Sequence, residues 1–153
     1  MKTSRGFTLL ELAVAMTVFI TLVTIGVPNY RNFVATQKVR TASYDLVSAL
    51  VFARSEAIKR NTTVSVTQAA GGWVGGWNIV AGTSLLRTQN PYSNGVTIAN
   101  SASIPTLTYS NDGRIATAPT DFTIAFTGIY STVTPRCVSI KPGGVPVTKL
   151  GSC

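Results

Sequence analysis

The hydrophobic pattern of the chain begins with an apolar run near the N-terminus. Phe7 to Val27 holds only apolar or small polar residues, except for the single charge of Glu11. A helix over this run would be roughly 31 Å long at about 1.5 Å per residue, which matches the hydrocarbon core of a bilayer. The run therefore predicts one membrane-spanning helix.

Beyond Pro28 the apolar residues recur at three- and four-residue steps, which is the spacing of an amphipathic helix. Pro28 lacks an N–H group and clashes with the preceding turn, so we expect a kink there rather than the end of the helix. The helix should stop near Arg60, because Asn61 suits a left-handed C-cap. Glu56 stands four residues before Arg60, a favourable order for an ion pair on a solvated face. The predicted apolar stripe consists of Val39, Ala42, Leu46, Ala49, Leu50, Ala53 and Ala57.

After Asn61 the period changes to two, and frequent Gly, Ser, Thr, Asn and Pro residues break the pattern into short predicted strands. We expect turns in the glycine-rich segment around Trp73 and at Asn111 to Gly113. The predicted fold class is α+β, with a long N-terminal helix packed on a small antiparallel β-sheet head. The expected strands are Thr63–Thr67, Trp77–Val80, Leu85–Thr88, Val96–Ala99, Thr106–Tyr109, Phe122–Phe126, Cys137–Ile140 and Val147–Leu150.

Two ordinary kinds of N-terminal segment share part of this pattern. A secretory signal peptide also has a basic start, here Lys2 and Arg5, but the apolar run is long and no clear small-x-small cleavage site precedes Pro28. A simple signal anchor gives the same topology, with the N-terminus in the cytoplasm. Neither explains Glu11, since a carboxylate in a membrane helix costs roughly 2.5 to 3.5 kcal/mol, and somewhat less near the interface.

Residues Gly6 to Glu11, which read G-F-T-L-L-E, resemble the prepilin processing site of type IV pilins and type II secretion pseudopilins. The resemblance implies cleavage between Gly6 and Phe7 by an inner-membrane prepilin peptidase, which also N-methylates Phe7. It further implies that Glu11 pairs, in the assembled filament, with the N-terminal amine of a neighbouring subunit. Such a pair would offset the cost of the buried carboxylate.

The same resemblance implies a division of the chain and a location. Residues 1–6 would be the leader peptide, 7–28 the transmembrane helix and 29–153 a periplasmic head with the type IV pilin-like fold. The protein would cross the inner membrane once and would later be assembled into a pilus or pseudopilus.

Several segments of the head resemble the minor pilin and pseudopilin family of FimT, FimU and GspH. They are Phe52 to Val66, which reads F-A-R-S-E-A-I-K-R-N-T-T-V-S-V, the turn Tyr109 to Arg114, and the pair Arg136 and Cys137. The resemblance implies a minor pilin that helps to initiate or cap the pilus together with other minor and major pilins. Two alternatives stay open: a type II secretion pseudopilin of the GspH type, and a DNA-binding minor pilin for natural transformation.

The charge balance bears on the DNA-binding alternative. The chain has 13 Lys and Arg against 5 Asp and Glu, a formal charge of +8, and such a charge attracts polyanions. The candidate DNA contacts are Arg114, Arg136, Lys141 and Lys149. The DNA-uptake branch of the family carries a tail motif resembling Gly-Arg-x-Arg, whereas this chain has Gly143 to Val147 there. Any DNA binding is therefore expected to be weak and independent of sequence.

The remaining candidate chemistry is limited to two cysteines. Cys137 and Cys153 lie near the C-terminus, and an exported head would place them where thiols oxidise, so we expect one disulfide that closes the tail. The chain has no histidine and few carboxylates, and no nucleophile lies beside a recognisable base. We therefore expect neither an enzyme nor a site for a metal or another cofactor.

Overall fold

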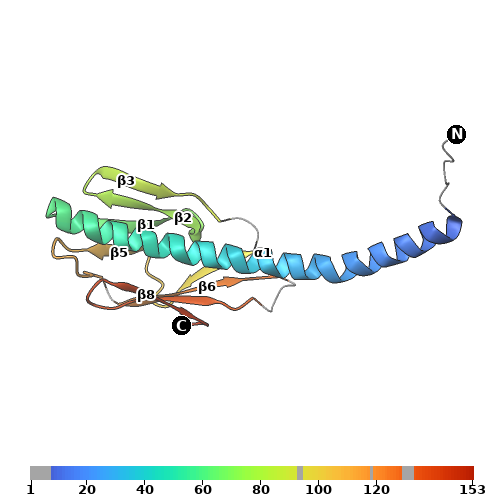
Figure 1. The fold of residues 1–153 in the computed structure, drawn as a ribbon. Coiled ribbons are helices and arrows are strands. Elements are labelled where there is room, and N and C mark those ends of the chain that lie inside the picture. The colour runs from blue at the N-terminus through green and yellow to red at the C-terminus, as the bar shows by residue number, and fades with distance from the viewer. Residues whose placement is uncertain (1–7, 93–94, 118, 129–132) are drawn as a thin grey trace.

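Helix α1, Leu9–Arg60, runs the length of the molecule, and the strands lie beside its C-terminal half (Figure 1). The structure is a computed structural model that describes residues 8–92, 95–117, 119–128 and 133–153. The helix continues through Pro28 without ending, and Figure 1 shows its N-terminal half as a curved extension beyond the head. The predicted continuity of the helix is thus confirmed.

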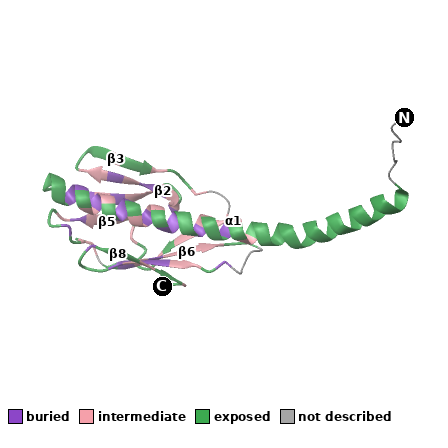
Figure 2. Ribbon diagram, in the orientation of Figure 1, coloured by how far each residue is buried: buried purple, intermediate pink, exposed green. Residues whose placement is uncertain are grey.

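The two halves of α1 differ in burial (Figure 2). From Thr8 to Arg31 every residue is exposed, whereas the C-terminal half buries one stripe against the sheets. That stripe includes all seven positions predicted from the three- and four-residue spacing, together with Ala35, Ser43 and Glu56. Leu46 and Leu50 are completely buried, so this half of the helix is the central element of the core.

The C-terminal end of α1 confirms one prediction and corrects another. Asn61 adopts the left-handed conformation, with φ 49° and ψ 42°, as expected for the cap. The assignment of Glu56 to a solvated face is wrong, because this residue is only 8% exposed. Its carboxylate accepts a hydrogen bond from Arg60 Nε on the next turn of the helix. That hydrogen bond, with the charges of Arg60 and Lys59, lowers the pKa of Glu56.

The strands form two antiparallel four-stranded sheets rather than one. In the first sheet the order is β3-β2-β1-β5, and in the second it is β4-β6-β7-β8. The strands are β1 Val64–Ala69, β2 Gly72–Ala81, β3 Ser84–Gln89, β4 Val96–Asn100, β5 Thr106–Tyr109, β6 Thr120–Phe126, β7 Arg136–Ile140 and β8 Pro146–Leu150. Each expected strand corresponds to one of these elements. The α+β class with an antiparallel head is confirmed.

The registers of the sheets place apolar rows toward the helix. In the first sheet Val66 pairs with Ile79 on one side and with Leu107 on the other, and all three are completely buried. Trp73 of β2 meets Phe122 of β6 edge to face, with ring centroids 4.9 Å apart. This contact joins the first sheet to the second, so that both share one core with α1.

The glycine-rich segment around Trp73 contains the expected turn, but the turn is only part of it. The β1–β2 register jumps from Gln68–Trp77 to Ala69–Gly72, so most of the segment is a bulge inside β2, next to a turn at positions 70 and 71. A Cβ atom on Gly76 would lie 2.1 Å from the carbonyl oxygen of Gln89. A Cβ atom on Gly75 would lie equally close to the carbonyl oxygen of Ala70, so these two glycines are required by close backbone approach, which local turn statistics do not reveal.

Candidate functional site

The N-terminal end of α1 is held by a capping box. The Glu11 backbone N–H donates to Thr8 Oγ1 at 3.2 Å, and the Thr8 N–H donates to Glu11 Oε2 at the same distance. The carboxylate of Glu11 thus points back toward the start of the helix, where the helix dipole also favours negative charge. Gly6 and Phe7, the expected processing site, lie outside the described residues.

Thr8 is a site residue that the sequence analysis missed. The signal was present, because Thr8-Leu9-Leu10-Glu11 has the spacing of a capping box before an apolar run. The consequence is that the helix starts at Leu9, directly after its N-cap Thr8, and that Glu11 has a local partner even in an isolated subunit.

The exposed half of α1 presents an apolar surface on all sides. Leu9, Leu10, Phe19 and Ile20 are each more than 60% exposed. By length and composition α1 could cross a membrane, although the structure contains no bilayer. An apolar surface of this extent on a single helix needs either lipid or the helices of neighbouring subunits to cover it.

Two of the four candidate DNA contacts, Arg114 and Lys141, lie on neighbouring loops of the head. Arg114 follows the predicted turn, in which the Gly113 N–H donates to the Ser110 carbonyl at 2.8 Å. Lys141 opens the turn that ends at Gly144, and a Cβ atom on Gly144 would lie only 2.4 Å from the Gly113 carbonyl oxygen. The two basic residues are therefore on loops that touch each other.

Tyr109 holds these two loops together from inside the core. It is completely buried, and its hydroxyl donates to the Gly144 carbonyl at 3.1 Å. Burial raises the pKa of Tyr109 to about 12, against the opposing charge of Arg54. Arg54 Nε in turn donates to the Gly113 carbonyl at 2.9 Å. The two loops, which hold Gly113 and Gly144 and are here called the tip of the head, are thus fixed by one hydrogen bond from α1 and one from β5.

The other two candidate DNA contacts do not join this pair. Arg136 lies over the ring of Tyr44 with Cζ 5.8 Å from the ring centroid, and Arg40 lies over the same ring at 5.5 Å. Cys137 pairs with Lys149 across β7 and β8, and successive strand residues point to opposite faces. Arg136 and Lys149 therefore point to opposite faces of the sheet.

A disulfide joins Cys137 and Cys153, the pair that the sequence analysis expected. Cys137 is buried in β7, and the backbone N–H of Cys153 donates to Thr123 Oγ1 of β6 at 3.2 Å. The last residue is therefore tied across two neighbouring strands of the second sheet.

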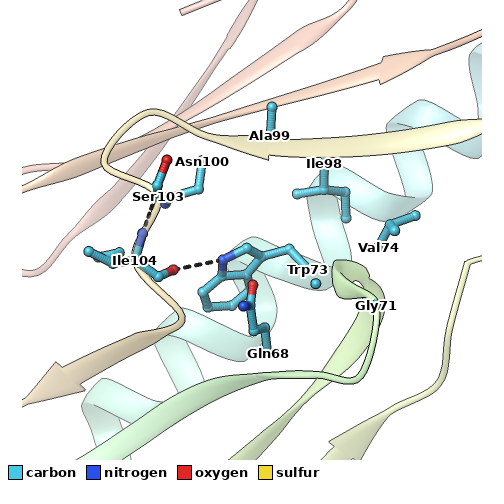
Figure 3. Close-up of a pocket in the computed structure, with 10 residues that line it drawn as sticks. Gln68, Gly71, Trp73, Val74, Ile98, Ala99, Asn100, Ser103 and Ile104 are labelled. Carbon is cyan, nitrogen blue, oxygen red and sulfur yellow. Dashed lines mark hydrogen bonds between the residues drawn. The ribbon is translucent and has the colours of Figure 1, made fainter.

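A cavity of about 380 Å³ opens between the β1–β2 turn and the segment from β4 to Ile104 (Figure 3). Two hydrogen bonds lie in its wall: Trp73 Nε1 donates to the Ile104 carbonyl and the Ile104 N–H donates to Asn100 Oδ1, both at 3.0 Å. The residues described around it include no acidic or basic side chain. The lining thus supplies no group for general acid or base catalysis.

Comparison with known protein families shows which family the chain matches. Residues 42–144 match the model of the type II transport protein GspH, and residues 1–27 match that of the prokaryotic N-terminal methylation motif. The first match covers well over half of the sequence. The chain belongs to the GspH family. This family consists of structural pilins and pseudopilins rather than enzymes. A search among curated protein sequences found no match.

Solved structures of minor pilins share the fold of this GspH-family chain. The type IV minor pilin FimU of Pseudomonas aeruginosa is similar with a TM-score of 0.65 and 23% sequence identity, over 77% of this chain and 91% of that one. The minor pseudopilin EpsH from the type 2 secretion system of Vibrio cholerae is similar with a TM-score of 0.54 and 13% identity, over 75% of this chain and 97% of that one. At these identities the likeness establishes the pilin fold, with one long helix against antiparallel sheets.

Proposed function

We propose that this protein is a minor pilin, cut between Gly6 and Phe7 by a prepilin peptidase, that helps to initiate or cap a type IV pilus. The observation that carries the proposal is the exposed apolar half of α1, continuous with the helix at the centre of the head. A subunit of this shape can be anchored in the inner membrane by the apolar half of α1, with its head in the periplasm. It can then enter a filament, where the same surface packs against other pilins.

The placement of Glu11 supports the same proposal. Its carboxylate lies at the end of α1 at which the new amine of Phe7 would appear after cleavage. An ion pair between Glu11 of one subunit and that amine of the next would draw a new subunit into axial register, because unlike charges in an apolar medium attract strongly.

Processing provides the first test. Mass spectrometry of the membrane-extracted protein should find a chain that starts at N-methyl-Phe7 in cells with active prepilin peptidase. The control is a Gly6→Leu variant, which should keep the leader and start at Met1, because a bulky side chain at the cleavage position obstructs the peptidase. Recovery of the wild-type protein with an intact Met1 would overturn the proposal.

A pseudopilin of a type II secretion system is the main alternative, because the family and the two related structures include both kinds of subunit. Deletion of the gene separates the two. Loss of surface pili with normal protein secretion supports the minor pilin, and loss of secretion with normal piliation supports the pseudopilin.

DNA binding stays a prediction from the sequence, and the two loops at the tip of the head suggest how many phosphate contacts to expect. Because only Arg114 and Lys141 lie on touching loops, we expect about two phosphate contacts and a slope of log K against log salt near −2 on duplex DNA. Gel-shift titrations across a salt series should show this weak, sequence-independent binding. The Arg114→Ala/Lys141→Ala variant should lose it, whereas Lys149→Ala should not. No shift at low salt would remove DNA binding, and a slope steeper than about −4 would place the contacts elsewhere.

A further inference from the structure

Two arginines from distant parts of the chain meet on one tyrosine ring beside α1. Arg40 stands one helical turn before Tyr44, and its Cζ atom lies 5.5 Å from the centroid of the Tyr44 ring. Arg136, the first residue of β7, reaches the same ring with its Cζ atom 5.8 Å from the centroid. These three residues are here called the arginine–tyrosine cluster. The cluster exists because β7 packs against α1, so it joins the helix to the second sheet.

The positive charge of the cluster acts on the Tyr44 hydroxyl. The pKa of Tyr44 is lowered, chiefly by hydrogen bonding to Arg40 and by the charge of Arg40, and to a smaller extent by the charge of Arg136. Tyr44 is half exposed and Arg40 is exposed, so solvent reaches this side of the ring. A carboxylate that approached from solvent would therefore meet the field of two cations beside a hydroxyl donor.

The chain has five acidic residues, and the structure describes all of them. Glu56 makes both of the ion pairs found in the described part of the chain, with Lys59 and Arg60. Asp45 follows the cluster tyrosine in sequence, but its carboxylate accepts a hydrogen bond from the Tyr92 hydroxyl at 2.8 Å. The acidic residues in the C-terminal half of α1 thus have their partners outside the cluster.

The other three acidic residues lie away from the cluster. Glu11 is near the start of α1, about 44 Å of helix before it. Asp112 accepts from a backbone N–H of its own turn at 3.0 Å. On β6, Asp121 and Ile124 point to opposite faces of the sheet, and Ile124 is the residue that pairs with Arg136. No ion pair within the described chain therefore balances the two arginines.

The surroundings of the cluster have the composition of a protein interface. Val51 follows Tyr44 by seven residues on the same face of α1, and both are half exposed. Leu150 of β8 pairs with Arg136 across the sheet, so it shares the face of that residue, and it is 68% exposed. Aromatic residues and arginines are enriched in protein interfaces, with apolar groups around them. Since a sugar–phosphate backbone would leave these apolar groups uncovered, an acidic protein surface fits better than DNA does.

We propose that the arginine–tyrosine cluster docks an aspartate or glutamate side chain from the head of a different pilin in the filament. The proposal rests on the filament membership proposed above and adds a point of contact to it. The argument is charge complementarity, because this chain presents two cations that its own carboxylates do not balance. A second copy of the chain is disfavoured as the partner, since two chains with a formal charge of +8 repel each other.

The first test reverses one charge of the cluster. Arg40→Glu should lower the amount of subunit in sheared filaments, relative to the membrane pool, by roughly tenfold or more, because it sets a like charge against the carboxylate of the partner. The matched control is Arg87→Glu, the same change at an exposed arginine of β3 in the other sheet, which should be incorporated normally. Both variants should keep the unfolding temperature of the wild-type protein, because both side chains are exposed.

The second test identifies the group that docks. Arg40→Lys keeps the positive charge and should enter filaments normally, but it offers a primary amine that a carbodiimide can couple to a carboxylate in contact with it. Mass spectrometry of treated filaments should find this amine joined by an amide bond to an Asp or Glu of another pilin. A bond to another copy of this chain, or to one of its own acidic residues, would overturn the proposal, and so would the absence of any bond in filaments that contain the variant.

The outcomes separate this proposal from the proposed function. Normal incorporation of Arg40→Glu would overturn the docking site and leave the minor pilin standing. Absence of the wild-type protein from filaments would overturn both. If Arg40→Glu entered filaments normally but abolished the gel shift with duplex DNA, the cluster would be a nucleic-acid site and the docking proposal would be wrong.

Discussion

Glu11→Gln should remove the protein from assembled filaments while leaving the unfolding temperature of the head unchanged. Glutamine at this position can still accept from and donate to Thr8, because capping boxes use either residue, so the start of α1 is preserved. The variant loses only the negative charge. Removing one partner of a buried ion pair costs about 3 to 5 kcal/mol, which corresponds to a drop in incorporation of roughly 100-fold or more.

The measurement is the amount of subunit in sheared filaments relative to the membrane pool, with circular dichroism of the purified protein as the check on folding. Thr8→Ala is the matched control, because it removes the cap, worth about 1 kcal/mol, and keeps the carboxylate. We expect this control to enter filaments. Normal incorporation of Glu11→Gln would show that the charge has no role in assembly. If both the incorporation and the unfolding temperature of the variant fell, Glu11 would act in folding.

Loss of the disulfide should produce the largest change in stability. The bridge between Cys137 and Cys153 closes a loop with a sequence separation of 16, for which the chain-entropy model gives about 3 kcal/mol. In a head of this size that loss corresponds to a fall in unfolding temperature of roughly 10 to 20 °C. The bond also restrains β8, the strand that comes just before Cys153 in the chain. β8 lies at the edge of its sheet and carries the exposed side chains of Val147 and Leu150.

The Cys137→Ser/Cys153→Ser variant should be compared with the wild-type protein in guanidinium titrations, with and without reductant. Reductant should lower the wild-type midpoint to near that of the variant and leave the variant itself unchanged. Ser152→Ala, a neighbouring substitution that keeps the bridge, serves as the control. Equal midpoints for the variant and the oxidised wild-type protein would contradict the assigned contribution.

The pairing of the cysteines was foreseen, but its structural role was not. An even count in an exported head was enough to predict the bond, because oxidation depends on location and number. The structure adds that the bond ties the last residue across β7 and β6, where Cys153 also donates to Thr123. That role depends on which strands are neighbours, and strand order is a property of the whole fold.

The placement of the basic residues, in contrast, could not be predicted from the sequence. Arg114, Arg136, Lys141 and Lys149, the candidate DNA contacts, are spread along the C-terminal third of the sequence. The sheet register sends Arg136 and Lys149 to opposite faces, and only the contact of two loops brings Arg114 near Lys141. Whether charges converge is decided by strand pairing and loop packing, which no local charge pattern contains.

By itself, the sequence determined the features that depend on neighbouring residues along one helix or strand. These are the apolar run around Glu11, the buried stripe of α1, the cap at Asn61 and the position of each strand, because their signals repeat every 3.6 or 2 residues. The tertiary structure alone decided the division into two sheets, the bulge that requires Gly76 and the burial of Glu56. Each of these arises where segments distant in the chain come into contact, and such contacts are chosen by the packing of the whole core rather than by any local pattern.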